Sequence, residues 1–193
     1  MIDPCILDIT LEFLSVAFHS ILYYASVYPK SIFETRKKYN IIVYRSVHPQ
    51  VNEYIDTTLK KIEQCFIEDR LDCVQFAVLD ANFKTIFTYV FQFGNLSDPN
   101  EPIDPYLVQC EMNLRAFCLK LSSLKCFFND MPQSSSFSIN IHTNDDAPLV
   151  LDSNFEIFPV EERYETRVEN NKVVPIKTLT IKNHSIESVL EFE

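Results

Sequence analysis

Residues 3–28, DPCILDITLEFLSVAFHSILYYASVY, decide the fold because they read as one long apolar helix. Asp3 and Pro4 match a helix N-cap and first-turn pair, and Pro29 marks the expected end. Its polar residues recur at roughly 100° per residue and form one narrow stripe. We therefore expect the central core helix of the domain, with a single wet edge. The stripe comprises Asp8, Glu12, Ser15, His19 and Ser26.

Composition narrows the classes of protein that this chain can represent. The 193 residues are 47% hydrophobic, which predicts one domain with a well-packed core. A single glycine, Gly94, excludes the glycine-rich phosphate loops of nucleotide-binding enzymes. A formal net charge of -10 disfavours strong direct DNA binding. The acidic residues within the first helix, with no basic segment before it, predict neither a signal peptide nor a membrane-spanning segment.

Apolar periodicity and turn residues predict further elements along the chain. They are a short strand over 39–44, a helix from His48-Pro49 to about Asp69, hairpin strands over 73–80 and 84–93, a helix from Asp104-Pro105 to about Phe128, and a strand over 137–143. Three long helices against a mostly antiparallel sheet make an α+β fold.

The character of the chain changes after Thr143. Residues 144–193 mix acidic stretches with strand-like pieces over 149–151, 155–158 and 173–181. We expect a single domain over 1–193, with a body over 1–143 and a mobile segment over 144–193. An ordinary C-terminal sheet edge is the alternative interpretation of that segment.

Residue types that carry catalysis form no recognisable motif. The histidines lack the spacing of metal ligands, and the six cysteines contain no C-x-x-C pair. We interpret His19 as the polar edge of the first helix, His48 as a helix start and His142 as a strand position, and the cysteines as reduced core residues. We predict no catalytic residues, no metal and no cofactor. A small cysteine- or metal-dependent enzyme is the alternative from another class.

Ordered motifs along the chain resemble the HORMA-domain family, and within it the accessory subunits of translesion DNA polymerase zeta. They are Val27-Tyr28-Pro29 with Ile32-Phe33, Arg36-Lys37-Lys38-Tyr39-Asn40, His48-Pro49 with Asn52-x-Tyr54-Ile55, Val78-Leu79-Asp80, Leu114-Arg115-Ala116-Phe117, and Val174-Pro175-Ile176-Lys177-Thr178. The basic run Arg36-Lys37-Lys38 taken alone reads as a solvated turn, or as a phosphate contact or localisation signal. The resemblance implies a HORMA fold whose C-terminal segment is a safety belt that closes over an extended partner peptide.

In function, the resemblance implies a non-catalytic nuclear adaptor for translesion synthesis and DNA damage tolerance. Such a protein clasps a Pro-x-x-x-Pro-Pro-like peptide of the polymerase zeta catalytic subunit and bridges it to a scaffold translesion polymerase. An AAA-type ATPase is the implied remodeller, and direct DNA binding is not expected. A spindle-checkpoint or meiotic HORMA protein with a different closure peptide is the alternative within the fold.

The resemblance also carries individual residues. It assigns Tyr54, Tyr28, Phe158, Pro159 and Val160 to the peptide site, where Val160 replaces a tryptophan that the family often has. The two tyrosines are otherwise buried core residues. On the third helix it assigns Arg115 to a dimer interface, although an arginine is common on any exposed helix face. It further assigns Val173 and Pro175 to a strand that meets the scaffold polymerase.

Overall fold

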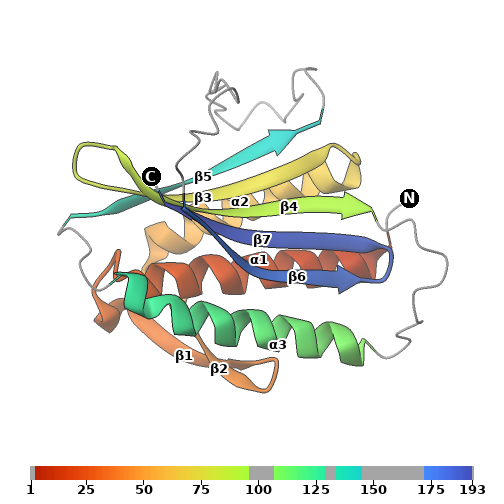
Figure 1. Cartoon of the computed structure of the whole chain (residues 1–193), viewed down its shortest axis with the longest axis horizontal. Coiled ribbons are helices and arrows are strands. Elements are labelled where there is room, and N and C mark those ends of the chain that lie inside the picture. The colour runs from red at the N-terminus through yellow and green to blue at the C-terminus, as the bar shows by residue number, and fades with distance from the viewer. Residues whose placement is uncertain (1–2, 96–106, 129–133, 145–171, 193) are drawn as a thin grey trace.

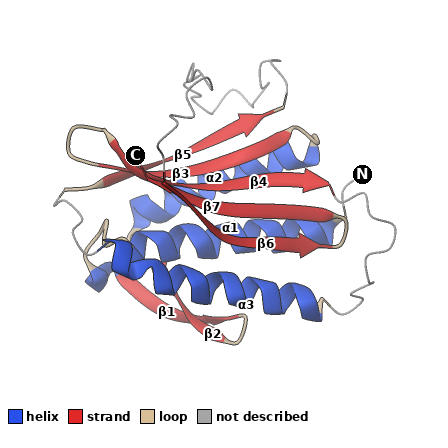
Figure 2. Ribbon diagram, viewed as in Figure 1, coloured by secondary structure: helices blue, strands red, loops and turns tan. Residues whose placement is uncertain are grey.

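The computed structural model describes residues 3–95, 107–128, 134–144 and 172–192. An antiparallel five-stranded sheet runs in the order β5-β3-β4-β7-β6, and β1 and β2 form a separate hairpin (Figures 1 and 2). This arrangement confirms the predicted α+β fold. The helices are α1 (Pro4–Tyr24), α2 (Pro49–Ile67) and α3 (Val108–Ser123); the strands are β1 (Phe33–Lys38), β2 (Ile41–Ser46), β3 (Leu71–Leu79), β4 (Thr85–Asn95), β5 (Ser136–Thr143), β6 (Lys172–Ile181) and β7 (His184–Phe192).

Helix α1 is the central core helix, as its sequence predicts, and it contacts both α2 and α3. The Asp3 side chain accepts a hydrogen bond from the Cys5 amide at 2.9 Å and caps the first turn. The helix ends at Tyr24, four residues before the predicted end, because Ser26 adopts a left-handed φ of 55° that turns the chain. Its length and mean hydropathy of 1.7 would suit a membrane span, but 61% of that stretch is buried inside the protein.

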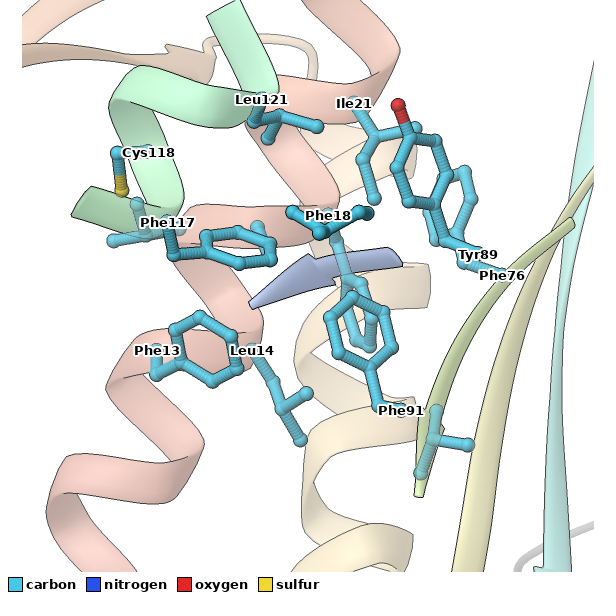
Figure 3. Close-up of a cluster of buried hydrophobic side chains, with 14 of the residues drawn as sticks. Phe13, Leu14, Phe18, Ile21, Phe76, Tyr89, Phe91, Phe117, Cys118 and Leu121 are labelled. Atoms are coloured by element: carbon cyan, nitrogen blue, oxygen red, sulfur yellow. The ribbon is translucent and has the colours of Figure 1, made fainter. Parts of the chain in front are cut away.

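Aromatic side chains of α1 hold the sheet and α3 together (Figure 3). Phe18 stacks on Phe76 of β3 at 5.4 Å and meets the edge of Phe91 of β4 at 6.0 Å. On the other side, Phe13 meets Phe117 of α3 at 4.8 Å. Ring pairs with these offset and edge-to-face geometries stabilise a core beyond their buried area. The cysteines at 65, 73, 110 and 118 are buried as predicted, and Cys5 is partly buried.

His19 was assigned to the wet edge of α1, and this assignment is wrong. Its side chain is buried, with 1% of its surface exposed, and its Nδ1 accepts a hydrogen bond from the Ser46 amide at 3.3 Å. Strand β2 covers this part of the helix. His19 therefore ties the β1–β2 hairpin to α1.

The β1–β2 hairpin also differs from the prediction of one strand over 39–44. Arg36, Lys37 and Lys38 lie within β1 and not in a turn, and Tyr39-Asn40 form the turn with φ values of 49° and 56°. Positive φ at both residues is typical of the two-residue turns that connect hairpin strands. Strand β1 lacks an apolar alternation because its side chains from Thr35 onward are exposed. Strand β1 forms because its backbone pairs with that of β2.

The second helix and the β3–β4 hairpin confirm the predictions. His48 is the residue before α2, and the Asp80 carboxylate accepts hydrogen bonds from the Asn82 and Lys84 amides in the hairpin turn. The third helix begins at Val108 and continues into a 3-10 turn, η2 (Leu124–Phe128). Its predicted start at Asp104-Pro105 lies outside the described residues.

Strand β7 was not predicted, and it lies inside the sheet between β4 and β6. Ile186 and Leu190 of β7 and Ile181 of β6 are fully buried. Contrary to the expectation of a body over 1–143, the hydrophobic core is not complete at Thr143. The predicted pieces over 149–151 and 155–158 lie outside the described residues.

Burial of His19 makes stability depend on pH. Desolvation lowers its pKa from 6.5 to about 4, so the unfolded chain binds this proton first as pH falls. The contribution is complete above pH 6.5 and is lost progressively toward pH 4. Between pH 7.5 and pH 5, we expect the free energy of unfolding to fall by about 2 kcal/mol more in the wild type than in His19→Asn. Urea denaturation measures both; parallel pH profiles would contradict the burial of an uncharged imidazole.

Candidate functional site

Strand β5 lies at one end of the sheet and has a strand neighbour, β3, on one side only within the described residues. The outer edge of such a strand presents backbone N–H and C=O groups that can pair with another extended chain. Phe137, Ile139 and Ile141 alternate along β5, and all three pack against the core. One face of the strand is thus held, while its edge is available for pairing.

Three aromatic side chains meet at this edge and form what we call the edge platform: Tyr28, Tyr54 and Phe137. The Phe137 ring stacks on Phe76 of β3 at 5.2 Å, and meets Tyr54 of α2 at 5.4 Å and Tyr28 at 6.2 Å, both nearly perpendicular. Tyr54 is 42% exposed, and Tyr28 is half-buried, which raises the pKa of its hydroxyl. The structure therefore brings together the two tyrosines named from sequence and adds Phe137.

Phe137 was predicted only as a strand residue, so its place in the platform was missed. The available signal was its position at the start of the strand that follows the Ser134-Ser135-Ser136 loop. Strand alternation assigns such a residue to the core face, and only tertiary packing shows which helix side chains stand beside it.

The Tyr54 hydroxyl accepts a hydrogen bond from the Ile139 amide at 3.1 Å. Ile139 is paired in register with Phe76 of β3, and the hydroxyl of a helix residue thus reaches the backbone of β5. Within α2, the Thr58 hydroxyl donates to the Tyr54 carbonyl at 2.8 Å. A phenol that accepts one hydrogen bond still has a proton to donate. The Tyr54 hydroxyl can therefore link two chains, because it accepts from the amide of β5 and can donate its own proton to a carbonyl of an added strand.

The other predicted site residues lie elsewhere. Arg115 is exposed on α3 in line with three exposed apolar side chains, and we call this row the α3 stripe: Val108, Met112, Arg115 and Leu119. Their spacing of four, three and four residues puts them on one helix face. The same spacing is visible in the sequence, but the apolar core positions between these residues were the pattern interpreted there. Phe158, Pro159 and Val160 lie outside the described residues.

Val173 and Pro175 lie on β6, the strand at the opposite end of the sheet from β5. Val173 is 51% exposed, and the pairing with β7 shifts register just after Pro175 because proline has no amide proton to donate. The Lys172 ammonium lies 5.1 Å from the Phe127 ring centre. The tyrosines predicted for the peptide site and the β6 residues predicted for a second partner thus lie at opposite ends of the sheet.

Catalytic chemistry finds no support in the described part of the chain. No cluster of three or more His, Cys, Asp or Glu side chains there could hold a metal ion. Burial raises the pKa of the Cys118 thiol to about 12 and also raises that of Cys65, which disfavours the reactive thiolate form. A cavity of about 140 Å³ is lined in part by Phe66, Phe93 and His184. It is well below the size of a typical small-molecule pocket.

The fold is shared with several solved structures. It is similar to a chain in "Crystal Structure of Mitotic Checkpoint Complex", with a TM-score of 0.79 and 14% identity over 97% of this chain and 98% of that one. It is also similar to "Structure of HTP-2 bound to HTP-3 motif-6", with a TM-score of 0.72 and 14% identity over 95% and 88%. The chain therefore has the HORMA fold.

Sequence comparison defines the family more narrowly, although no family model matches the chain. It is 33% identical over 179 residues to "Mitotic spindle assembly checkpoint protein MAD2B" of Bos taurus, covering 90% of this chain and 84% of the relative. The human protein of that name is 32% identical over 177 residues with the same coverage. "DNA polymerase zeta subunit 2" of Drosophila melanogaster is 27% identical over 155 residues, covering 79% and 78%. The chain belongs to the MAD2B family of HORMA proteins.

The hydrogen bond at the platform can be tested without any ligand. We expect Tyr54→Phe to lower the free energy of unfolding by about 1 kcal/mol, because the Ile139 amide loses its acceptor. Tyr28→Phe is the matched control, since the Tyr28 hydroxyl has no hydrogen bond within the described residues; its effect should stay within about 0.5 kcal/mol. Chemical denaturation measures both. Equal effects of the two substitutions would contradict the hydrogen bond between the Ile139 amide and the Tyr54 hydroxyl.

Proposed function

We propose that this protein is a non-catalytic adaptor subunit of DNA polymerase zeta that acts in the nucleus during bypass of DNA lesions. It holds a proline-containing peptide of the catalytic subunit along β5 and bridges that subunit to a scaffold translesion polymerase. The observation that carries the proposal is the edge platform, which places Tyr54 and Phe137 beside the outer edge of β5, a strand that has one strand neighbour within the described residues. Relatives named as polymerase zeta subunits in Drosophila melanogaster and in Schizosaccharomyces pombe support the choice of polymerase.

A proline-containing strand suits this edge for two reasons. Main-chain hydrogen bonds to β5 supply affinity. The exposed aromatic faces of the platform can pack against apolar rings of the peptide, which alternate side chains of the peptide carry. Proline fixes part of the peptide backbone in advance, which lowers the entropy cost of ordering it. Tyr54 serves both purposes, because its ring is partly exposed and its hydroxyl can donate to the peptide. The expected Pro-x-x-x-Pro-Pro pattern is consistent with a peptide that pairs through its backbone and packs its proline rings on the aromatic side chains.

Strand order supports a safety belt. Strands β5 and β6 are the two outer strands, so the chain passes from one side of the sheet to the other between Thr143 and Lys172. Four inter-strand spacings separate them, a distance of about 19 Å. We propose that this connection closes over the bound peptide, with Phe158, Pro159 and Val160 contributing to the pocket. Exchange of the peptide then requires local unfolding, which makes both association and dissociation slow.

The opposite edge supports the bridging role. Val173 and Pro175 are exposed on β6, which pairs with β7, and β7 pairs with β4 in the rigid interior of the sheet. A partner on β6 and a peptide on β5 can therefore bind at the same time without competing for one surface. We propose that β6 contacts the scaffold polymerase.

Calorimetric titration with a Pro-x-x-x-Pro-Pro peptide tests the peptide site. We expect one-to-one binding that Tyr54→Ala weakens by about 2 kcal/mol or more, roughly thirtyfold, because an anchor ring and a hydrogen bond are lost. Phe83→Ala is the control, since Phe83 is 79% exposed in the β3–β4 turn and is not one of the platform residues. Absence of binding by the wild type, or equal losses in the two variants, would refute the proposed site.

The α3 stripe supports a HORMA dimer. An arginine surrounded by exposed apolar side chains is typical of an interface anchor. We expect Met112→Glu/Arg115→Glu to lower the dimer fraction in sedimentation velocity at least tenfold, with an unchanged circular dichroism spectrum. A wild type that stays monomeric at all concentrations, or a variant that dimerises equally well, would contradict the interface.

A spindle-checkpoint function is the second candidate. It is favoured by the names of the vertebrate relatives and by the structural similarity to a chain of the mitotic checkpoint complex. The two functions require the same fold and differ in the peptide that is bound. Side-by-side titration with polymerase and checkpoint peptides distinguishes them.

A further inference from the structure

Positive charge is concentrated in two short segments of this acidic chain. Residues 30–47 contain five basic side chains and a single acidic one, Glu34, for a net charge of +4. Residues 112–128 contain three basic side chains and no acidic one, for a net charge of +3. Because the whole chain carries -10, the remaining residues together carry -17. The basic residues are Lys30, Arg36, Lys37, Lys38 and Arg45 in the first segment, and Arg115, Lys120 and Lys125 in the second.

The fold places these two segments side by side. The first forms η1 (Lys30–Ile32) and the β1–β2 hairpin, and Tyr24 of α1 lies between this hairpin and α3, with Tyr44 of β2 at 5.7 Å on one side and Ser122 of α3 on the other. Tyr44 of β2 stacks on Tyr23 at 3.4 Å, and the Lys30 ammonium lies 4.8 Å from the centre of the Tyr23 ring. The pKa of the Tyr44 hydroxyl is raised chiefly by its hydrogen bond with Tyr23, and the nearby positive charges of Lys30 and Lys125 oppose that rise. The fold therefore brings cations that are far apart in sequence into one region, while the rest of the chain is acidic.

Most of this charge is available to a ligand. Lys37, Arg45 and Lys125 are exposed and make no ion pair within the described residues. Arg36 pairs with Glu34 and Lys38 pairs with Glu12, but all four side chains are about half exposed. Exposed pairs of this kind contribute little to stability, so exchanging them for another anion costs little.

The shape of the hairpin indicates which polyanion fits. Strands β1 and β2 pair over six residues in a two-stranded ribbon that is separate from the main sheet. Lys37 and the 64% exposed Ile42 lie opposite each other on its outer face, whereas Arg36 lies on the other face, opposite the buried Val43. The major groove of B-form DNA admits a two-stranded ribbon, whereas the deep and narrow major groove of A-form RNA does not. Backbone contacts from lysine and arginine need no particular base sequence.

We propose that the β1–β2 ribbon, flanked by Lys125, is a docking surface for the backbone of double-stranded DNA. The net charge of the chain disfavours strong binding as a whole, and the acidic remainder keeps the affinity low. The local charge orients the protein, so that the ribbon meets the duplex and the acidic surfaces point away from it. The resulting contact is weak, independent of sequence and sensitive to salt.

Fluorescence anisotropy with a labelled 20-base-pair duplex tests this surface on the full chain. At 50 mM salt we expect a dissociation constant in the range of about 1 to 100 μM, and a slope of log K against log salt of about -3 to -4, as four phosphate contacts give. The test variant is Lys37→Glu/Lys125→Glu. The control is Lys60→Glu/Lys84→Glu, which changes the net charge equally at exposed positions outside both segments.

We expect the test variant to weaken DNA binding at least tenfold and the control to weaken it less than twofold, with equal thermal stability. Equal weakening in both variants would reduce the effect to net charge and overturn the proposal. Absence of binding by the wild type at 50 mM salt would also overturn it. If polyglutamate of equal total charge competes as well as unlabelled duplex does, the surface serves an acidic protein and not DNA.

Discussion

Burial of α1 is the constraint on which the rest of the structure depends. This helix is apolar around most of its circumference, so it must be covered on several sides at once. The sheet covers Phe18, α3 covers Phe13, and the β1–β2 hairpin covers His19. Each surface that the protein presents to a partner is the outer side of one of these covering elements. The positions of the strand edges, the α3 stripe and the basic ribbon all follow from the packing around one helix.

An open sheet with two outer strands explains how an adaptor can work without chemistry. Closing the sheet would remove both edges, whereas the order β5-β3-β4-β7-β6 leaves an outer strand at each end. A strand edge recognises backbone and carries little sequence information, so specificity must come from the few side chains beside it. At β5 these are Tyr54 and Phe137; Tyr54 meets the edge or face of Phe137 at nearly a right angle, and Phe137 stacks on Phe76 in the core. The rigidity of the core is thereby passed to the platform, and less entropy is lost when a peptide binds.

Sequence periodicity predicted the elements whose apolar pattern is set by the main core, and it failed where one element depends on another. Helix α2 and the β3–β4 hairpin have strong periodicity and were found. Strand β1 is polar and exists because β2 pairs with it, and in β7 Ser188 occupies a buried position where an apolar residue would have signalled a strand. His19 lies on the polar stripe of a helical projection, which contains no information about the hairpin that covers it. For the site, resemblance supplied Tyr28 and Tyr54, but the contribution of Phe137 depends on tertiary contacts.

The separation of charge gives this acidic molecule a cationic region at a defined position relative to its strand edges. A net charge describes the field of a protein at long range, whereas a partner at contact distance meets the local charge within about 10 Å. At that range the β1–β2 face is cationic although the chain as a whole is anionic. The hairpin that carries these cations is held to α1 by the hydrogen bond to His19 and the stacked Tyr23–Tyr44 pair. Its orientation relative to both strand edges is therefore fixed, so an anionic partner bound to the hairpin would also fix the directions in which the outer edges of β5 and β6 face.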